Sequence, residues 1–129
     1  MKIAIFGASG FMGGALTHEA LERGHTVTAI VHVTPLQIKH ERLTAVTGDA
    51  TDASSVAAVV AGHEAVAVAI GGRGNLEVVP AGARAFLASL PRAGVKRLVC
   101  VGAGGLLLVA PGVRLFDTPQ FLEFRLFWQ

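Results

Sequence analysis

The sequence predicts an α/β fold in which a parallel β-sheet is covered by helices on both faces. Three observations support this prediction. Short apolar segments alternate with longer helical segments along most of the chain. The strand segments are continuously apolar, which is typical of parallel strands buried on both faces. A glycine-rich turn directly follows the first strand segment, at the place where such sheets commonly bind ligands.

The composition is that of one folded domain. The chain has 129 residues, of which 52% are hydrophobic and 16% charged. We therefore expect a single domain over residues 1–129, with a core in 1–105 and an apolar tail in 106–129. The net charge of +2 comes from scattered basic residues, so no nucleic-acid partner is expected.

Residues 98–113 are uncharged, but they are fewer than the roughly 20 that a membrane-spanning helix needs. Because the segment also contains several glycines, it predicts a buried strand followed by a loop, and no membrane partner is expected. The single cysteine, Cys100, is interpreted as a small core residue. One cysteine and no signal-peptide core together predict a cytoplasmic protein.

The first βαβ unit is the clearest local pattern. Residues 2–6 are rich in isoleucine and predict a buried strand that ends at Gly7. Residues 11–23 place apolar side chains at helical spacing. Residues 26–31 are apolar and β-branched, and they predict the second strand. The whole unit has about 30 residues, the size expected of a βαβ unit.

The later elements continue the alternation. They are a third strand at 43–47, a helix from an Asp52 cap to Gly62, a fourth strand at 65–70, a helix at 76–90 and a fifth strand at 96–101. Right-handed crossovers predict the strand order 3-2-1-4-5, which is a Rossmann-type doubly wound sheet. We expect this sheet to be truncated after the fifth strand.

The turn after the first strand carries the strongest functional signal. Its sequence is Gly7-Ala8-Ser9-Gly10-Phe11-Met12-Gly13. Glycines at this spacing allow a tight turn, close approach of the backbone to a pyrophosphate and close packing of the helix on the strand. The helix N-terminus then offers N–H groups to the phosphates. The alternative is a turn whose glycines serve packing alone.

The opening segment, residues 2–14, resembles the atypical short-chain dehydrogenase/reductases. This NAD(P)H-binding branch includes NmrA-like and flavin reductase-type proteins. Further matches are Gly48-Asp49-Ala50-Thr51-Asp52, Ala69-Ile70-Gly71-Gly72 and the segment 94–99, so the resemblance covers residues 1 to about 105. It implies an NAD(P)-binding oxidoreductase that transfers hydride from NADPH to a small acceptor.

The resemblance also implies a set of cofactor-binding residues. Gly7, Gly10 and Gly13 would line the pyrophosphate, and Ser9, Phe11 and Met12 would supply backbone contacts beside them. Asp49 with Ala50 would meet the adenine edge, and Gly71 and Gly72 would pass under the nicotinamide ribose. For Asp49 the alternative is a turn residue ahead of a helix.

The end of the second strand predicts NADP rather than NAD. NAD binders usually place an acid there to bond the ribose hydroxyls, whereas this chain has Val31-His32-Val33-Thr34. Many relatives carry Arg where His32 stands, so the resemblance implies that His32 meets a 2′-phosphate, helped by Lys39 or His40. The alternative is a strand end that faces solvent.

The catalytic residues cannot be assigned from the sequence. Short-chain dehydrogenases generally use a Tyr-x-x-x-Lys pair and a hydroxyl after the fifth strand, but this chain has no tyrosine and no hydroxyl in 102–106. A non-catalytic NmrA-like sensor and an inactive truncated paralogue therefore remain alternatives. The histidines lack metal-ligand spacing, so we expect no metal site and interpret all of them as surface or loop residues.

The tail contains a cluster of large apolar side chains, namely Phe121, Leu122, Phe124, Leu126, Phe127 and Trp128. Relatives of the family continue for one or two more strands and helices, so we expect a fragment, an altered C-terminus or a divergent tail here. The tail is predicted to pack over an uncovered part of the sheet or to drive self-association.

Overall fold

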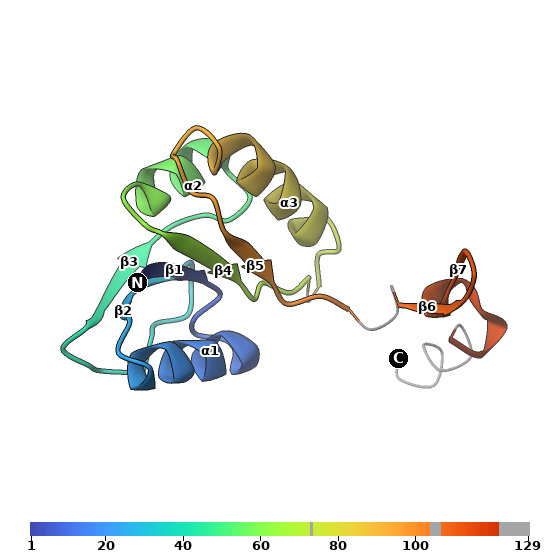
Figure 1. Ribbon diagram of the computed structural model, residues 1–129, viewed down its shortest axis with the longest axis horizontal. Helices are drawn as coiled ribbons and strands as arrows, with labels where there is room; N and C mark the ends of the chain where they lie inside the picture. The colour runs from blue at the N-terminus through green and yellow to red at the C-terminus, as the bar shows by residue number, and fades with distance from the viewer. Residues whose placement is uncertain (73, 104–106, 122–129) are drawn as a thin grey trace.

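Five parallel strands form the central sheet of the protein (Figure 1). The structure is a computed structural model, and it describes residues 1–72, 74–103 and 107–121. The strands are β1 (Lys2–Phe6), β2 (Thr26–Val31), β3 (Leu43–Thr47), β4 (Ala65–Val68) and β5 (Leu98–Cys100). Their order is β3-β2-β1-β4-β5, which confirms the predicted Rossmann-type sheet. Every neighbouring pair is parallel.

Helices cover both faces of this sheet. Helix α1 (Phe11–Glu22) lies on one face, and α2 (Ala53–Val60) and α3 (Val78–Ser89) lie side by side on the other (Figure 1). Helix α2 begins as predicted, because the Asp52 carboxylate accepts a hydrogen bond from the Ser55 N–H at 2.9 Å.

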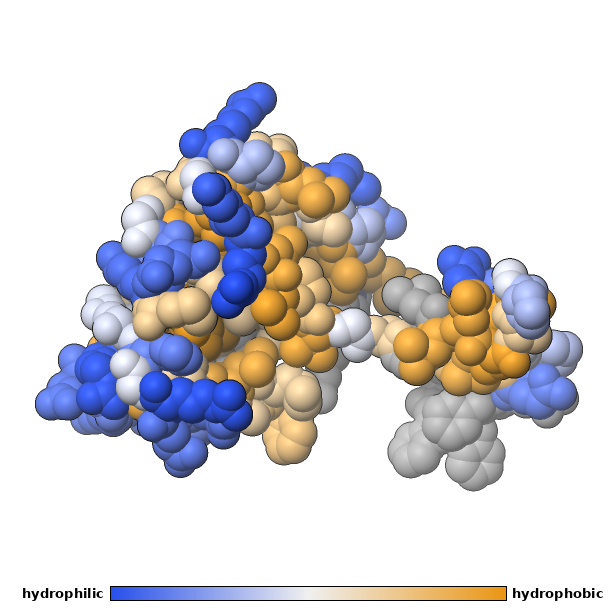
Figure 2. Space-filling model, in the orientation of Figure 1, coloured by the Kyte–Doolittle hydropathy of each residue, from blue (hydrophilic) through white to orange (hydrophobic). Residues whose placement is uncertain are grey.

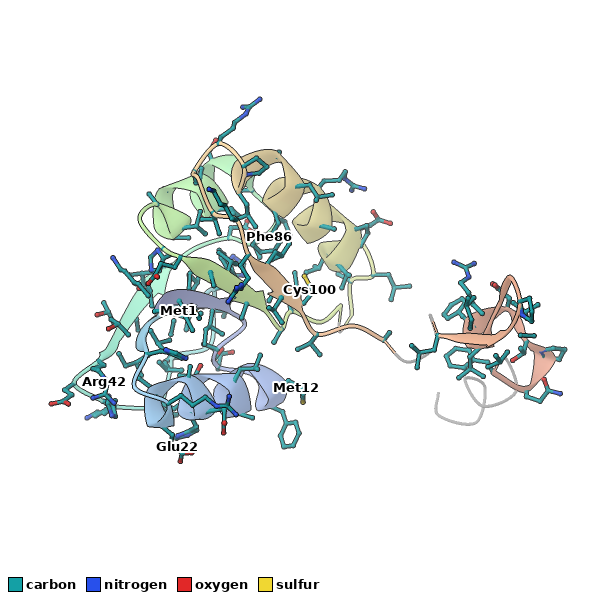
Figure 3. All side chains as sticks on the ribbon, in the orientation of Figure 1. Met1, Met12, Glu22, Arg42, Phe86 and Cys100 are labelled. Carbon is teal, nitrogen blue, oxygen red and sulfur yellow. The ribbon has the colours of Figure 1, made fainter. Side chains whose placement is uncertain are left out.

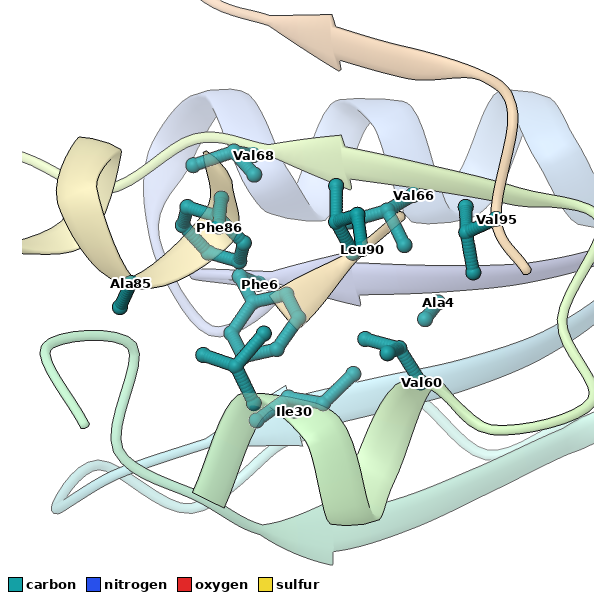
Figure 4. Close-up of a cluster of buried hydrophobic side chains, with 11 residues drawn as sticks. Ala4, Phe6, Ile30, Val60, Val66, Val68, Ala85, Phe86, Leu90 and Val95 are labelled. Atoms are coloured by element: carbon teal, nitrogen blue, oxygen red, sulfur yellow. The ribbon is translucent and has the colours of Figure 1, made fainter. Parts of the chain in front are cut away.

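The core has one apolar cluster on each face of the sheet. Successive side chains of β1 point to opposite faces, so Phe6 belongs to the α2–α3 cluster and Ile5 to the α1 cluster. Phe6 meets Phe86 of α3 edge to face, with ring centroids 4.8 Å apart (Figure 4). On the other face, Leu21 of α1 packs in the same cluster as Val27 of β2. These two clusters fix the helices against the sheet whose edge carries the candidate site.

Strand β5 differs from its prediction as a buried strand. Leu98 is 38% exposed and Val99 is 53% exposed. Because β5 is the edge strand beside β4, it has a neighbour on one side only. Cys100 lies on β5 and is exposed, so its interpretation as a core residue is wrong (Figure 3).

The segment after β5 also differs from the predicted loop. It forms a hairpin of β6 (Leu108–Ala110) and β7 (Val113–Arg114), which turns at Gly112 with φ of +72°. A 3₁₀ turn, η2 (Leu115–Asp117), follows and is closed by an ion pair between Arg114 and Asp117 at 2.8 Å. Residues 106 and 122–129 of the predicted apolar tail lie outside the described part of the chain.

One of the histidines interpreted as surface or loop residues lies in a loop but is buried. His63 follows α2, and the residue is 9% exposed. Its Nδ1 lies 3.1 Å from the Val60 carbonyl, and its Nε2 lies 2.8 Å from the Thr28 hydroxyl. Hydrogen bonds to both ring nitrogens make burial of this polar side chain tolerable.

Two searches over the described residues gave no candidates. Within residues 1–72, 74–103 and 107–121, no helix has the length and apolar character needed to cross a membrane. The same residues contain no group of three or more His, Cys, Asp or Glu side chains arranged to hold a metal ion.

Candidate functional site

A cleft of about 740 Å³ opens at the carboxyl-terminal edge of the sheet. Its walls come from the turns that follow β1, β2, β3 and β4, together with the start of α3. Strand β1 lies between β2 and β4 in the sheet. The strands that follow β1 directly, β2 and β3, lie on one side of it, and the later strands β4 and β5 lie on the other, so the strand order reverses at β1. In open α/β sheets, ligands bind at such a switch point.

The glycine-rich turn forms one wall of the cleft, and its glycines have different roles. Gly7 has φ of +79°, and a Cβ there would collide with the Ala69 carbonyl of the neighbouring turn. A Cβ on Gly13 would overlap the Gly7 carbonyl, so close packing of helix on strand requires this glycine. Gly10 is exposed, and its Cβ would lie 3.2 Å from the Gly7 oxygen. The fold requires the first two glycines, while Gly10 lies exposed on the wall of the cleft.

Helix α1 starts at this wall without a side-chain cap. Gly10 occupies the N-cap position, and the first turn contains no acidic residue. The first N–H groups of an α-helix have no partner within the helix. The dipole makes this end positive, so the wall at Gly10 and Phe11 is suited to an anion such as a phosphate.

The turn after β3 presents a fixed carboxylate to the cleft. The Asp49 carboxylate accepts hydrogen bonds from the Thr51 N–H at 2.8 Å and from the Thr51 hydroxyl at 2.7 Å. These bonds hold the pKa of Asp49 below its ordinary value, and the nearby charge of His32 lowers this pKa further. Asp49 is therefore an anion at neutral pH.

The turn after β2 brings His32 to the same cleft. His32 and Thr34 both line it. The two side chains predicted to assist His32 do not, since neither Lys39 nor His40 belongs to the lining. The His40 ring instead accepts a hydrogen bond from the Arg42 N–H at 3.0 Å.

Most of the residues predicted for the site do line the cleft. They are Gly7, Ser9, Gly10, Phe11, His32, Asp49, Ala50 and Gly71. Met12, Gly13 and Gly72 do not belong to the lining. Gly13 is buried beneath the turn, and Gly72 accepts a hydrogen bond from the Asn75 N–H at 3.0 Å in a neighbouring turn.

Sequence reasoning missed several lining residues. They are Phe6, Ile30, Thr34, Gly48, Thr51, Ala69, Ile70, Asn75 and Val78. Most of them lie at or next to the end of a predicted strand, and this position could have been used to predict that they line the cleft. Asn75 and Val78 reach the cleft because the chain folds back between β4 and α3, which no local pattern indicates.

The cleft offers few groups for proton transfer. The chain has no tyrosine, and the hydroxyl groups in the lining come from Ser9, Thr34 and Thr51. Among the described residues, His32 is the histidine that lines the cleft.

Comparisons with known proteins agree with this geometry. A family model described as NAD(P)H-binding matches residues 7–125. An uncharacterized protein of Bacillus subtilis, YwnB, is 38% identical over 126 residues, which cover 94% of this chain and 57% of that protein. The chain thus spans little more than half the length of this relative.

Solved structures are similar over the same extent. A putative epimerase from Bacteroides thetaiotaomicron is 37% identical with a TM-score of 0.81, and the match covers 92% of this chain and 55% of that one. A putative NADH-flavin reductase from Streptococcus pneumoniae is 28% identical with a TM-score of 0.71, and the match covers 94% and 57%.

Proposed function

This chain belongs to the NAD(P)H-binding family, and on that basis we propose that it is an oxidoreductase using NADPH to reduce a small acceptor. The observation that carries the proposal is the cleft at the switch point, where the uncapped start of α1 meets an open glycine turn. A nicotinamide dinucleotide bound there would supply the hydride. The chain itself would bind, orient and shield the reactants.

The residues present fit a dinucleotide. A pyrophosphate fits against Gly10, because the backbone can approach it closely there and no acidic side chain repels it from α1. Ser9 in the turn, and Phe11 and Met12 at the start of α1, would add backbone contacts. Gly71, whose Cβ position is open, would pass under the nicotinamide ribose.

The turn after β3 fits an adenine. Asp49 provides an acceptor and the neighbouring Ala50 N–H provides a donor, and both residues line the cleft. Adenine presents a complementary amino donor and ring-nitrogen acceptor along one edge. Asp49 and Ala50 would therefore meet the base while the α1 turn holds the phosphates.

The turn after β2 favours NADPH over NADH. No acid lies between Arg23 and His40, so none is available on β2 to bond both ribose hydroxyls. His32 lines the cleft at the end of β2 and would donate a hydrogen bond to a 2′-phosphate. His32 also lies close enough to Asp49 to lower the pKa of that carboxyl group electrostatically.

The acceptor is proposed to need little acid assistance. The chain has no tyrosine for the usual proton donor, so a flavin- or quinone-like acceptor suits the cleft better than a simple ketone. The similarity to a putative NADH-flavin reductase supports this choice.

We also propose a cytoplasmic location, because the lone cysteine has no internal disulfide partner.

The same lack of proton donors favours a second candidate, a sensor that binds the dinucleotide without turning it over. Fluorescence titration with NADPH and NADH, followed by NADPH-oxidation assays with flavins, quinones and carbonyl compounds, tests both candidates. The oxidoreductase predicts tight NADPH binding and steady oxidation with at least one acceptor class. Tight binding with no oxidation would favour the sensor, and no binding of either dinucleotide would refute both.

A further inference from the structure

We propose that the outer edge of β5 is an interface at which a second copy of this chain adds its own β5 in antiparallel orientation. The two sheets would then form one continuous sheet across a two-fold axis at Val99. Among the described residues, no strand pairs with this edge, since β5 ends the order β3-β2-β1-β4-β5. The described lining of the cleft contains no residue of β5, so the inference does not depend on the proposed function.

The backbone of β5 directs hydrogen-bonding groups to this outer edge. On the inner side, the Arg97 carbonyl accepts a hydrogen bond from β4 at 2.9 Å, and the Val101 N–H donates one to β4 at 2.9 Å. Alternate residues of a strand direct their backbone groups to the same neighbour. Leu98 and Cys100 therefore direct their N–H and C=O groups outward, where a further strand can pair with them.

Apolar side chains surround the same edge. Val99 of β5 is 53% exposed, and Leu87 of α3 is 71% exposed. Leu87 and Leu98 line a groove of about 180 Å³ beside α3 and β5, and its other lining residues are apolar except for Lys96. A two-fold axis perpendicular to the sheet would place α3 of both copies on the same face. Pairing of the two strands would then also bring the two apolar grooves together, and their burial would favour association.

The charges around β5 favour a second copy in antiparallel orientation. Lys96 and Arg97 directly precede the strand, whereas residues 101–103, which follow it, are uncharged. A two-fold axis at Val99 would place the two cations opposite Val101 and Gly102 of the second copy, so that no like charges meet. Parallel pairing in register would instead place each cation opposite its own counterpart. The edge is therefore complementary to itself in the antiparallel orientation.

The same axis fixes the register and the size of the assembly. It pairs Leu98 of each copy with Cys100 of the other, so that all the outward groups of both strands form hydrogen bonds. Two copies that meet through the same edge leave no further β5 edge available, and the assembly stops at a dimer. The two Cys100 residues would be diagonal neighbours across the paired strands, about 7–8 Å apart.

The test measures mass and position together. Analytical ultracentrifugation of the full chain over a concentration series gives the mass, and a short bismaleimide cross-links cysteines of paired copies. Cys100 is the single cysteine, so every cross-link reports its position. Leu98→Pro removes an outward N–H and spares the bonds to β4, because an edge strand tolerates proline where its N–H faces away from the sheet. Leu98→Ala is the matched control, since it shortens the same side chain and keeps the N–H.

The wild type should reach a mass of two chains and should cross-link through Cys100. Leu98→Pro should dimerise about tenfold or more weakly than Leu98→Ala, because each copy loses a donor at the interface. Equal dimerisation of the two variants, or a mass that rises beyond two chains, would overturn the proposal. A monomer at every concentration would also overturn it, and slow reaction of Cys100 with the reagent would then indicate cover by the same chain.

Thermal unfolding checks that each variant retains the fold, and amide hydrogen exchange in the wild type tests the proposal without any variant. The N–H groups of Leu98 and Cys100 should exchange more slowly as the protein concentration rises, because pairing protects them. The Val99 N–H is the internal control, since it faces β4 and should exchange at the same rate throughout. Exchange of the two outward N–H groups that does not depend on concentration would overturn the proposed interface.

Discussion

At the scale of single residues, the glycine turn separates the requirements of folding from those of binding. Gly7 and Gly13 are fixed by contacts within the protein, because a Cβ at either position meets backbone atoms. Gly10 has an exposed position on the wall of the cleft. Substitutions along one short turn should therefore have different consequences.

We expect Gly10→Val to lower dinucleotide affinity by about a hundredfold or more, because its side chain would occupy space that a pyrophosphate needs. The protein should remain folded. Fluorescence titration and thermal unfolding measure the two effects. Gly14→Ala is the control, since a Cβ there lies in ordinary contact, 3.7 Å from the Ala8 oxygen. Normal binding by folded Gly10→Val would exclude the assigned phosphate site.

The second residue-scale prediction concerns the charge of Asp49. Its pKa lies below the ordinary value of 3.8, mainly because Thr51 donates two hydrogen bonds to the carboxylate. The associated stability is present above pH 3.8 and is lost as the pH falls through the folded-state pKa. Thr51→Val should raise this pKa. Carbon-detected NMR titration of the side-chain carboxyl group measures it, and an equal midpoint in both proteins would contradict the assigned cause.

The third prediction concerns His32 and cofactor choice. NADPH should bind about tenfold or more tightly than NADH, since a hydrogen bond to a phosphate is charge-assisted. Histidine side chains gain positive charge between pH 8 and pH 6, so the preference should increase over that interval. His32→Ala should remove the increase. Titrations of both cofactors at both pH values test this, and equal affinities throughout would refute the NADP assignment.

At the scale of elements, α2 illustrates how one side chain defines a helix start. The Asp52 cap joins the helix to the turn that holds Asp49, so the element and the site share one hydrogen-bond network. Asp52→Ala should lower the free energy of unfolding by about 1 kcal/mol. Ser54→Ala is the control, because Ser54 is exposed beside the cap. Urea denaturation measures both, and equal stabilities would show that the cap contributes nothing.

The alternating elements were predictable because each strand and helix carries its own periodic pattern. The βαβ unit over residues 2–31 and the Asp52 cap depend on local sequence alone, and the structure confirms them. The burial of His63 depends on Thr28, which is 35 residues distant, and local sequence does not reveal such a partner. The exposure of β5 likewise follows from its place in the sheet and not from its composition.

At the scale of the whole molecule, apolar surface lies over both β5 and the hairpin (Figure 2). Val99 and Val101 of the β5 segment are 53% and 41% exposed, and Leu108 of the hairpin is 65% exposed. Exposed edge strands with apolar side chains favour pairing with another chain.

We therefore expect the protein to self-associate at micromolar concentration and above. Val99→Lys, which places a charge on this edge strand, should reduce the associated fraction several-fold. Light scattering over a concentration series measures the mass. Ala88→Lys is the control, because it adds the same charge on an exposed position of α3. A monodisperse monomer at every concentration would contradict the prediction.

The candidate site was predictable where it depends on strand ends and glycines. Gly7 and Gly10 were predicted from the glycine turn, His32 and Asp49 were predicted with the help of the family resemblance, and all four line the cleft. Thr51 and Asn75 were not assigned, because their roles arise from hydrogen bonds within turns and from the return of the chain between β4 and α3. The cofactor roles of these residues stay predictions until binding is measured.

Phe6 belongs both to the core and to the cleft. The residue is 1% exposed and its ring packs against that of Phe86, so this part of the cleft wall is held by the core. Phe11, at the rim, is 92% exposed. A ligand would thus find a part of the wall that is already ordered, and the conformational entropy lost on association would come mainly from the rim. Phe6 would thus help to stabilise the fold and also keep this part of the cleft ordered before a ligand binds.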